Sequence, residues 1–202
     1  SNPSDITTCV CVDSADIVLF NELAADAGSD QDLCGSTSTT VTGNTPSYYP
    51  DTTSVQWTRI YGTATFTSPT TLTTTVNTLN TSYSDGYATD TLVYAVTNNG
   101  VCTTYDTMVI FNYQPPIPDP GSHQYLCDVT STTLTGSKED WETGEWVIVD
   151  GPGTISTPSS PTSAVTNLVA GDTTRLRWRV SNGPCSNPSD ITTCVCVDSA
   201  DI

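Results

Sequence analysis

The sequence predicts an all-β protein that consists of two β-sandwich domains in tandem. Residues with a high helix propensity gather only at 21–27, a stretch too short to form a stable helix. Elsewhere Thr, Ser, Val and Tyr dominate short runs separated by Gly, Pro, Asn and Asp, which is typical of many short strands. An internal duplication divides the chain into two similar halves. We therefore expect two domains of the same fold.

The duplication is carried by short blocks that occur in the same order in both halves. The first half contains LCG at 33–35, TTVTG at 39–43, a Trp at 57, LVYAVTN at 92–98 and a Cys at 102. The second half contains LCD at 126–128, TTLTG at 132–136, a Trp at 146, LRWRVSN at 176–182 and a Cys at 185. The Pro-rich segment 115–120 lies between the halves and should form an extended, stiff linker.

Each half shows the alternation of a half-buried strand. Because successive side chains of a strand point to opposite faces, one residue in two should face the core. The predicted core positions are Leu92, Tyr94, Val96, Leu176, Trp178 and Val180. Trp57 and Trp146 fall on other expected strands, 55–60 and 145–149. A buried Trp on a central strand, facing a strand near the end of the domain, is the core plan of an immunoglobulin-like sandwich.

The first 17 residues recur without change at 186–202, at an offset of 185 residues. An identity of this length indicates a tandem array with a period of 185 residues, of which this chain holds one period and an overlap. Residues 16–21 (DIVLFN) also match 107–112 (TMVIFN), the expected closing strand of the first domain. We therefore assign 1–21 to the preceding copy, 22–113 to the first domain and 114–202 to the second, which should lack its last strand.

The composition excludes several classes of function. The net charge is −17, from 22 acidic and 5 basic residues, so we expect no nucleic-acid partner and no attraction to anionic membranes. No apolar stretch is long enough to span a bilayer, so we expect no direct membrane insertion. The eight Cys indicate disulfides and an oxidising compartment, so we expect an extracellular protein.

Several motifs then point to a known family. The stretch 25–34 (ADAGSDQDLC) resembles the AGxDQxLC opening of PKD-like repeats, and 120–127 (PGSHQYLC) resembles it more loosely. The stretch 146–155 (WVIVDGPGTI) is similar to the core motif of these repeats, whereas 61–66 (YGTATF) departs from it in the first domain. Such repeats fill giant secreted surface proteins of Bacteroidota, including gliding-motility adhesins. The resemblance implies a bacterial cell-surface location and a role in adhesion stalks, and it implies no catalytic residues.

The cysteines occur at matching places in the two halves. Cys34 and Cys102 are equivalent to Cys127 and Cys185, and we expect Cys34 to bridge Cys102. For the second domain two arrangements stay open. One pairs Cys127 with Cys196 and Cys185 with Cys194, and the other pairs Cys127 with Cys185 and closes a small Cys194–Cys196 ring. Cys9 and Cys11 are the repeat copies of Cys194 and Cys196, so they should lack partners within this chain.

Four carboxylates lie near the expected domain joins, Asp26, Asp30 and Asp32 at one and Asp119 at the other. Oxygen ligands of this kind suit calcium, which would stiffen an array. The spacing matches no EF-hand loop, and the simpler interpretation is a set of solvated acidic loops. We therefore expect no cofactor, with these carboxylates as the only calcium candidates.

Three of the five basic residues form a ladder on the outer face of one expected strand, at Arg175, Arg177 and Arg179. Glu142 and Glu145 lie on or near the expected neighbouring strand, so we expect salt bridges across the two. The alternative is a docking face for an acidic partner.

The sequence Asp-Ser/Thr followed by an aliphatic residue or Thr is similar to the O-glycosylation motif of Bacteroidota. The hydroxyl residues that carry it are Ser14, Thr52, Thr91, Thr107, Thr173 and Ser199. These residues are equally at home in ordinary strands, which favour Thr.

Three functions remain for such a chain. We expect no enzyme, because His123 is the single histidine and lies in the linker, where no triad surrounds it. The first interpretation is a stalk or spacer in a long adhesin. Its partners are adjacent copies end to end, with surface polysaccharide or other cells as further candidates. The second is a filament subunit that donates a strand to a neighbouring chain. The third is a carbohydrate-binding module, for which Tyr48, Tyr49 and Trp141 are the candidate aromatics.

Overall fold

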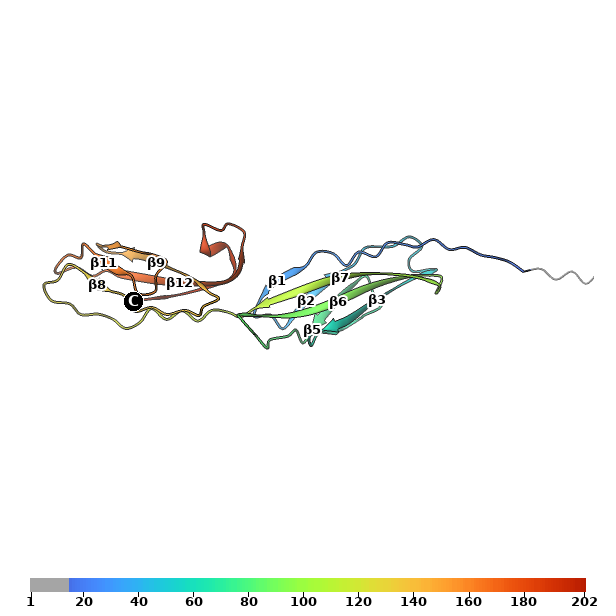
Figure 1. Cartoon of the computed structure of the whole chain (residues 1–202), viewed down its shortest axis with the longest axis horizontal. Coiled ribbons are helices and arrows are strands. Elements are labelled where there is room, and N and C mark those ends of the chain that lie inside the picture. Colours follow the sequence, from blue (N-terminus) through green and yellow to red (C-terminus); the bar gives the residue numbers. More distant parts are fainter. Residues whose placement is uncertain (1–14) are drawn as a thin grey trace, which may run out of the picture.

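The structure is a computed structural model, and it describes residues 15–202. Two β-sandwiches lie end to end along the long axis of the molecule, and the chain from residue 15 runs toward the first of them from one end (Figure 1). The strands of the first sandwich are β1 (Gln31–Cys34), β2 (Ser38–Thr42), β3 (Thr53–Tyr61), β4 (Thr65–Phe66), β5 (Thr73–Asn77), β6 (Tyr87–Asn98) and β7 (Cys102–Tyr113).

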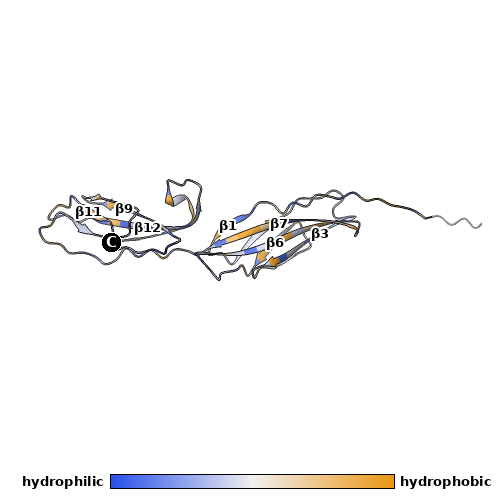
Figure 2. Ribbon diagram, in the orientation of Figure 1, coloured by the Kyte–Doolittle hydropathy of each residue, from blue (hydrophilic) through white to orange (hydrophobic). Residues whose placement is uncertain are grey.

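The first sandwich has a four-stranded sheet in the order β1-β7-β6-β3 and a three-stranded sheet in the order β2-β5-β4. Strand β1 pairs with β7 in parallel, whereas the β6–β7 and β3–β6 pairs are antiparallel. Hydrophobic and hydrophilic positions alternate along β3, β6 and β7 (Figure 2). The expected strand 55–60 lies within β3.

The second sandwich has a similar plan but, within residues 15–202, no strand that corresponds to β1. They are β8 (Thr132–Thr133), β9 (Thr143–Asp150), β10 (Thr154–Ile155), β11 (Ala164–Thr166), β12 (Arg175–Cys185) and β13 (Cys194–Asp201), with one 3-10 turn, η1 (Ile191–Thr193), before β13. The two sheets have the orders β13-β12-β9 and β10-β11-β8. The expected strand 145–149 lies within β9.

An equivalent pair of aromatic residues forms the centre of each core. Trp57 lies opposite Tyr94 across β3 and β6, with ring centroids 4.7 Å apart. Trp146 lies opposite Trp178 across β9 and β12, at 4.9 Å. The polar atoms of Tyr94 and Trp178 also have equivalent partners. Each donates to the carbonyl of the residue that directly follows a Thr-Gly pair, which is Asn44 for Tyr94 and Ser137 for Trp178. Hydrogen bonding of this kind lets large aromatic side chains be fully buried.

The predicted core positions are confirmed in both domains. Leu92, Tyr94, Val96, Trp178 and Val180 are at most 1% exposed, and Leu176 is 7% exposed. The buried residues form two separate clusters, one within each sandwich. The period-two alternation of the sequence therefore sets the inward face of β6 and of β12.

The expectation that the second domain lacks its last strand is wrong in part. Strand β13 pairs with β12 from Cys185 to Arg177, so the first half of this strand is present. The equivalent strand β7 begins at Cys102, which is five residues before Thr107, where the sequence predicted its start. What the second domain does not contain is the second half of the strand, because β7 continues to Tyr113 while β13 ends at Asp201.

Candidate functional site

At the joint between the two domains a buried side chain makes polar contacts with distant segments of the chain. The amide of Asn182, which is 5% exposed at the end of the LRWRVSN block, donates to Gly86 O at 2.7 Å and to Gln114 O at 2.9 Å. Gly86 and Gln114 belong to the first domain and the linker, so one buried side chain joins both to β12. Gln114 N in turn donates to Gly86 O at 2.8 Å.

Two aromatic residues complete the contact surface of the joint. Gly86 approaches the Trp141 ring so closely that a Cβ on it would lie 2.2 Å from the ring, and a Cβ on Gly183 would lie 2.9 Å from the Tyr113 ring. Burial, followed by the adjacent Asp32 carboxylate, raises the pKa of Tyr113 to about 12, so its phenol stays neutral at physiological pH. The joint is therefore a packed interface rather than a free hinge.

A disulfide crosses this joint. Cys34, at the end of β1, is bonded to Cys196 on β13, with the two Cα atoms 5.2 Å apart, a separation typical of disulfides. The expected Cys34–Cys102 bridge is wrong, because Cys34 lies at the end of the first domain that faces the second, whereas Cys102 begins β7 at the opposite end. The expected Cys127–Cys196 pair is wrong as well, because Cys196 is bonded to Cys34.

The remaining cysteines fall into two groups. Cys185 is bonded to Cys194, which closes the loop that contains η1, and this half of the first arrangement is present. The alternative Cys127–Cys185 bridge with a Cys194–Cys196 ring is wrong. Among residues 15–202, Cys102 and Cys127 have no disulfide partner. Cys9, Cys11 and the glycosylation candidate Ser14 lie outside the described residues.

The arginine ladder of β12 is paired, in part with a residue that the sequence comparison did not identify. Arg177 donates to both carboxylate oxygens of Asp201 on β13, at 2.6 and 3.0 Å. Arg179 lies 3.7 Å from Glu145 on β9, as expected. Glu142 makes no such contact, because its carboxylate accepts from Glu139 N at 2.8 Å within its own loop. Arg175 completes the ladder opposite Asp150.

The Arg177–Asp201 pair leads to a testable pH dependence. Hydrogen bonds from Arg177 lower the pKa of Asp201 below its ordinary value of 3.8. A depressed carboxyl pKa stabilises the folded state above the unfolded pKa, and that contribution is lost as the pH falls through the folded pKa. We expect an NMR titration of the Asp201 carboxyl to give a midpoint below 3.8, and Arg177→Met to move it back toward 3.8. An unchanged midpoint in Arg177→Met would contradict this assignment.

The four calcium candidates lie apart, and their carboxylates serve the local backbone. Asp26 and Asp119 make the same turn in the two domains, accepting from Gly28 N at 2.9 Å and from Gly121 N at 2.8 Å. Asp30 accepts from Val109 N at 2.7 Å, and Asp32 lies next to Tyr113. Within residues 15–202 no group of three or more His, Cys, Asp or Glu is arranged to hold a metal ion. These contacts favour a structural use of the four carboxylates.

The hydroxyl candidates for glycosylation differ in accessibility. Thr52, Thr107, Thr173 and Ser199 are exposed, whereas Thr91 is half-buried in β6. The aspartate before Thr91 is Asp90, which is wholly buried and holds backbone groups of a neighbouring loop. We therefore expect Thr91 to be the poorest acceptor of the five.

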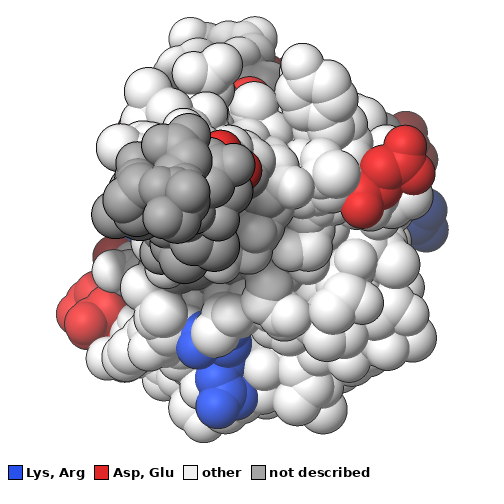
Figure 3. Space-filling model, turned by 90° about the vertical axis from the view of Figure 1, so that its right-hand side faces the viewer, with Lys and Arg blue, Asp and Glu red and all other residues white. Residues whose placement is uncertain are grey.

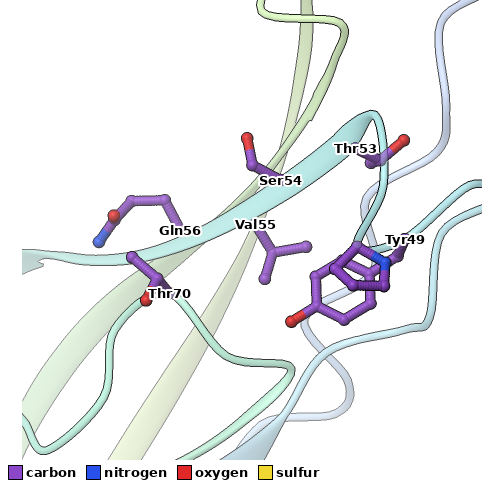
Figure 4. Close-up of a pocket in the computed structure, with 7 residues that line it drawn as sticks. Tyr49, Thr53, Ser54, Val55, Gln56 and Thr70 are labelled. Atoms are coloured by element: carbon purple, nitrogen blue, oxygen red, sulfur yellow. The ribbon is translucent and has the colours of Figure 1, made fainter.

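The aromatic candidates for carbohydrate binding do not form a row. Tyr48 is 71% exposed at the N-terminal end of the first domain, Tyr49 lies partly against the first core, and Trp141 faces Gly86 in the joint. A cavity of about 310 Å³ beside Tyr49 is lined by Tyr49, Pro50, Thr53, Ser54, Val55, Gln56 and Thr70. Figure 4 shows that Ser54 projects from the other side of β3 to Val55. This cavity contains one aromatic ring and no charged group.

A second, larger hollow of about 730 Å³ lies at the N-terminal end of the first domain. Its walls are the segment 19–23 together with Ser47, Tyr48, Thr52, Asn98 and Asn99. Asn98 donates to Asn21 O at 3.0 Å, and Thr104 donates to Leu23 O. The segment 19–23 thus covers this end of the first domain. The linker covers the end of the second domain that faces the first in the same way. No helix within residues 15–202 has the length and apolar character needed to cross a bilayer.

Comparison with known proteins bears on the fold. No family model matches the chain, and no curated protein matches its sequence. The structure is similar to Sidekick-1 immunoglobulin domains 1–5, with a TM-score of 0.50 and 16% identity, over 90% of this chain and 38% of that one. It is also similar to DIP-gamma IG1+IG2, with a TM-score of 0.43 and 12% identity, over 89% and 94% of the two chains.

A further similarity is to the PKD domain from the KIAA 1837 protein. The TM-score is 0.40 and the identity 20%, over 52% of this chain and 99% of that one. At such identities a likeness shows the fold alone, and the Sidekick-1 match carries it. The chain is therefore an all-β protein made of tandem immunoglobulin-like β-sandwich domains.

Proposed function

We propose that this chain is one period of a tandemly repeated extracellular structural protein, a stalk that extends an adhesin from a bacterial cell surface. Each joint of the array would have the geometry of the joint described above. The proposal rests on the fit between two features of the chain, the exposed segment 16–21 and the incomplete last strand of the second domain.

The two copies of one sequence position carry the argument. Ile17 and Ile202 are the same residue of the 17-residue repeat. Ile202 packs against the second core, and it exchanges two backbone hydrogen bonds with Leu176. Ile17 is 97% exposed in front of the first domain. A residue that packs against the second domain at one end of the chain and is exposed before the first domain at the other supports assigning both copies to a strand of the second domain.

The residues that follow Ile17 match the missing half of that strand. By the alignment of 16–21 with 107–112, Leu19 corresponds to Ile110 and Asn21 to Asn112. Ile110 and Asn112 are both 0% exposed in the first domain, and the Asn112 amide donates to Ser36 O at 2.8 Å and Asn80 O at 3.0 Å. Leu19, in contrast, is 91% exposed. It would be buried by a second domain placed before it.

The second domain has the matching open position. In the first domain the end of β7, Ile110–Tyr113, pairs with β1. The equivalent of β1 in the second domain is the segment 124–127, which forms no strand, and its Tyr125 is 94% exposed. An unpaired edge of this kind accepts an added strand readily. Residues 19–22 of the next copy would fill it.

The other parts of the proposal follow from general chemistry. Two disulfides among residues 15–202 fit an oxidising, extracellular setting. A net charge of −17 per chain keeps a long polymer soluble and disfavours side-by-side association. The exposed hydroxyls Thr52, Thr107, Thr173 and Ser199 are available for O-linked glycans. The partners are then adjacent copies end to end, with polysaccharide or other cells as ligands of the complete adhesin.

The test is a tandem chain in which Ile202 of one copy is followed directly by Val18 of a second copy. We expect hydrogen exchange of the amides of residues 19–22 to slow at the new joint, because they would enter the sheet. The second domain of the first copy should become more stable by about 2–4 kcal/mol, mainly through burial of Leu19. The control is Leu19→Ser in the second copy, which should remove most of the gain. Equal exchange in the single and tandem chains would contradict the proposal.

Separate chains provide the comparison with the filament alternative. If single chains associate and show the same protection at 19–22, strand donation between chains replaces covalent continuity. If protection needs the tandem chain, the stalk is supported.

A further inference from the structure

Cys102 and Cys127, which are unpaired within residues 15–202, occupy the places of a bridged pair. Cys102 is the first residue of β7 and Cys196 the third residue of β13, and each lies opposite the asparagine that ends the block shared by the two halves. The register pairs Asn98 with Cys102 and Asn182 with Cys196. Cys102 is therefore the structural counterpart of Cys196, which is bonded across the joint to Cys34.

Cys127 is the counterpart of Cys34 by the same kind of evidence. Three residues before each cysteine is a glutamine that clamps the next strand. Gln31 donates to Thr40 O at 3.0 Å and accepts from Thr39 Oγ1 at 2.7 Å. Gln124 donates to Thr133 O at 2.9 Å and accepts from Thr132 Oγ1. The segments that lead to Cys127 and to Cys34 are thus held against their own domains by the same pair of glutamine hydrogen bonds.

The surroundings of Cys102 already resemble those of a cysteine at a joint. Cys196 Sγ lies 3.6 Å from the carbonyl of Tyr113, where the first domain passes into the linker. Cys102 Sγ lies 3.7 Å from the carbonyl of Phe20, in the segment that precedes the first domain. Asn98 contacts this segment through Asn21 O, as Asn182 contacts the linker through Gln114 O. Seen from this end, the molecule has a mostly uncharged surface with a few separate acidic and basic patches (Figure 3).

The opposite end of the molecule presents the complementary part. In the joint, the loop before β6 presents Gly86, at φ +84°, against Trp141. The corresponding loop before β12 has Gly171 at φ +86°, and a Cβ on it would meet nothing within 4 Å. Cys127 is exposed. The first domain contributes a loop and a cysteine to the joint. The second domain has the counterparts of both at this end, and no other part of residues 15–202 covers them.

We propose that Cys127 of one copy forms a disulfide with Cys102 of the next copy, so that the joints between copies are bridged like the joint within a copy. The inference rests on the proposed tandem array. Two thiols give one disulfide with the loss of two protons and two electrons. The electrons pass to the disulfide of a thiol oxidant, which is reduced to a dithiol, as is required for the Cys34–Cys196 bridge.

The experiment uses the tandem chain described above, with Cys9→Ser and Cys11→Ser in its first copy, refolded in a reduced and oxidised glutathione buffer. Four thiols are then at issue, Cys102 and Cys127 of each copy. We expect alkylation without reductant to label two of them, Cys102 of the first copy and Cys127 of the second. Non-reducing peptide mapping should find the other two joined. In the single chain with the same two substitutions, both Cys102 and Cys127 should be alkylated.

A matched pair of variants locates the bridge. Cys102→Ser in the second copy should expose Cys127 of the first copy to alkylation, whereas Cys102→Ser in the first copy should leave the bridge intact. Labelling of all four thiols, or a bridge from Cys102 of the second copy to any cysteine other than Cys127 of the first, overturns the inference. Slow amide exchange at residues 19–22 with four labelled thiols would retain the array and reject the bridge. Fast exchange with four labelled thiols would reject both.

Discussion

Asp90→Ala should destabilise the first domain by about 4 kcal/mol, because it leaves three backbone donors without a partner. The Asp90 carboxylate is 0% exposed, and it accepts from Thr63 N at 2.6 Å, Ala64 N at 2.8 Å and Asn80 N at 2.7 Å. These amides belong to the loops on either side of the β4–β5 hairpin. One side chain thus satisfies donors that the sheets do not use, and each buried donor left unpaired costs about 1–3 kcal/mol.

Urea denaturation followed by Trp fluorescence measures this effect. Asp90→Asn should cost about half as much, since the amide keeps one acceptor oxygen for Thr63 and Ala64 but turns a donor toward Asn80 N. The matched control is Thr174→Ala. Thr174 is the counterpart of Asp90 in the second domain, because it lies two residues before Leu176 as Asp90 lies two residues before Leu92. It donates a hydrogen bond to Pro152 O at 2.5 Å, so Thr174→Ala should cost about 1 kcal/mol. A loss below about 1 kcal/mol for Asp90→Ala would contradict this role.

Cys34→Ser should lower the free energy of the final unfolding step by about 4 kcal/mol. The Cys34–Cys196 bridge spans 162 residues, and closing so long a loop restricts the unfolded chain by about 5 kcal/mol in the chain-entropy model. Because the loop contains strands of both domains, the restriction applies fully only when both have unfolded. The domain that unfolds second therefore loses most of the stability.

Chemical denaturation without reductant, compared between the variant and the parent chain, checks this expectation. The control is Cys127→Ser, which replaces an exposed and unbridged thiol and should change stability by less than about 0.5 kcal/mol. If Cys34→Ser behaves like Cys127→Ser, the bridge contributes nothing to the folded chain. Small-angle scattering should also show a wider range of angles between the domains in Cys34→Ser.

Much of the fold could be read from the sequence because each domain follows local rules. Period-two alternation identifies the inward residues of β6 and β12, and the duplicated Trp positions identify the strands that pair with them. The duplication also made the equivalence of the two domains visible. None of this depends on how one domain is placed against the other.

The disulfide pairing could not be read in the same way. A duplicated sequence shows that Cys34 and Cys127 are equivalent, but it does not show whether each faces its own domain or its neighbour. That depends on the parallel pairing of β1 with the end of β7, which takes Cys34 to the joint. Likewise, the partner of Arg177 was missed because Asp201 lies in the part of β13 that was assigned to a missing strand.

The bridge across the joint also determines how far an array of these copies could lengthen under tension. A pull along the backbone passes directly from Cys34 to Cys196 through the sulfur atoms, so the residues between them are not stretched. With a period of 185 and a bridge that spans 162 residues, only 23 residues connect one bridge to the next. Fully extended, they reach about 80 Å. Two sandwiches in line, at strand dimensions, already occupy roughly 70–90 Å. Such a fibre would transmit force with almost no gain in length, even if its domains unfolded.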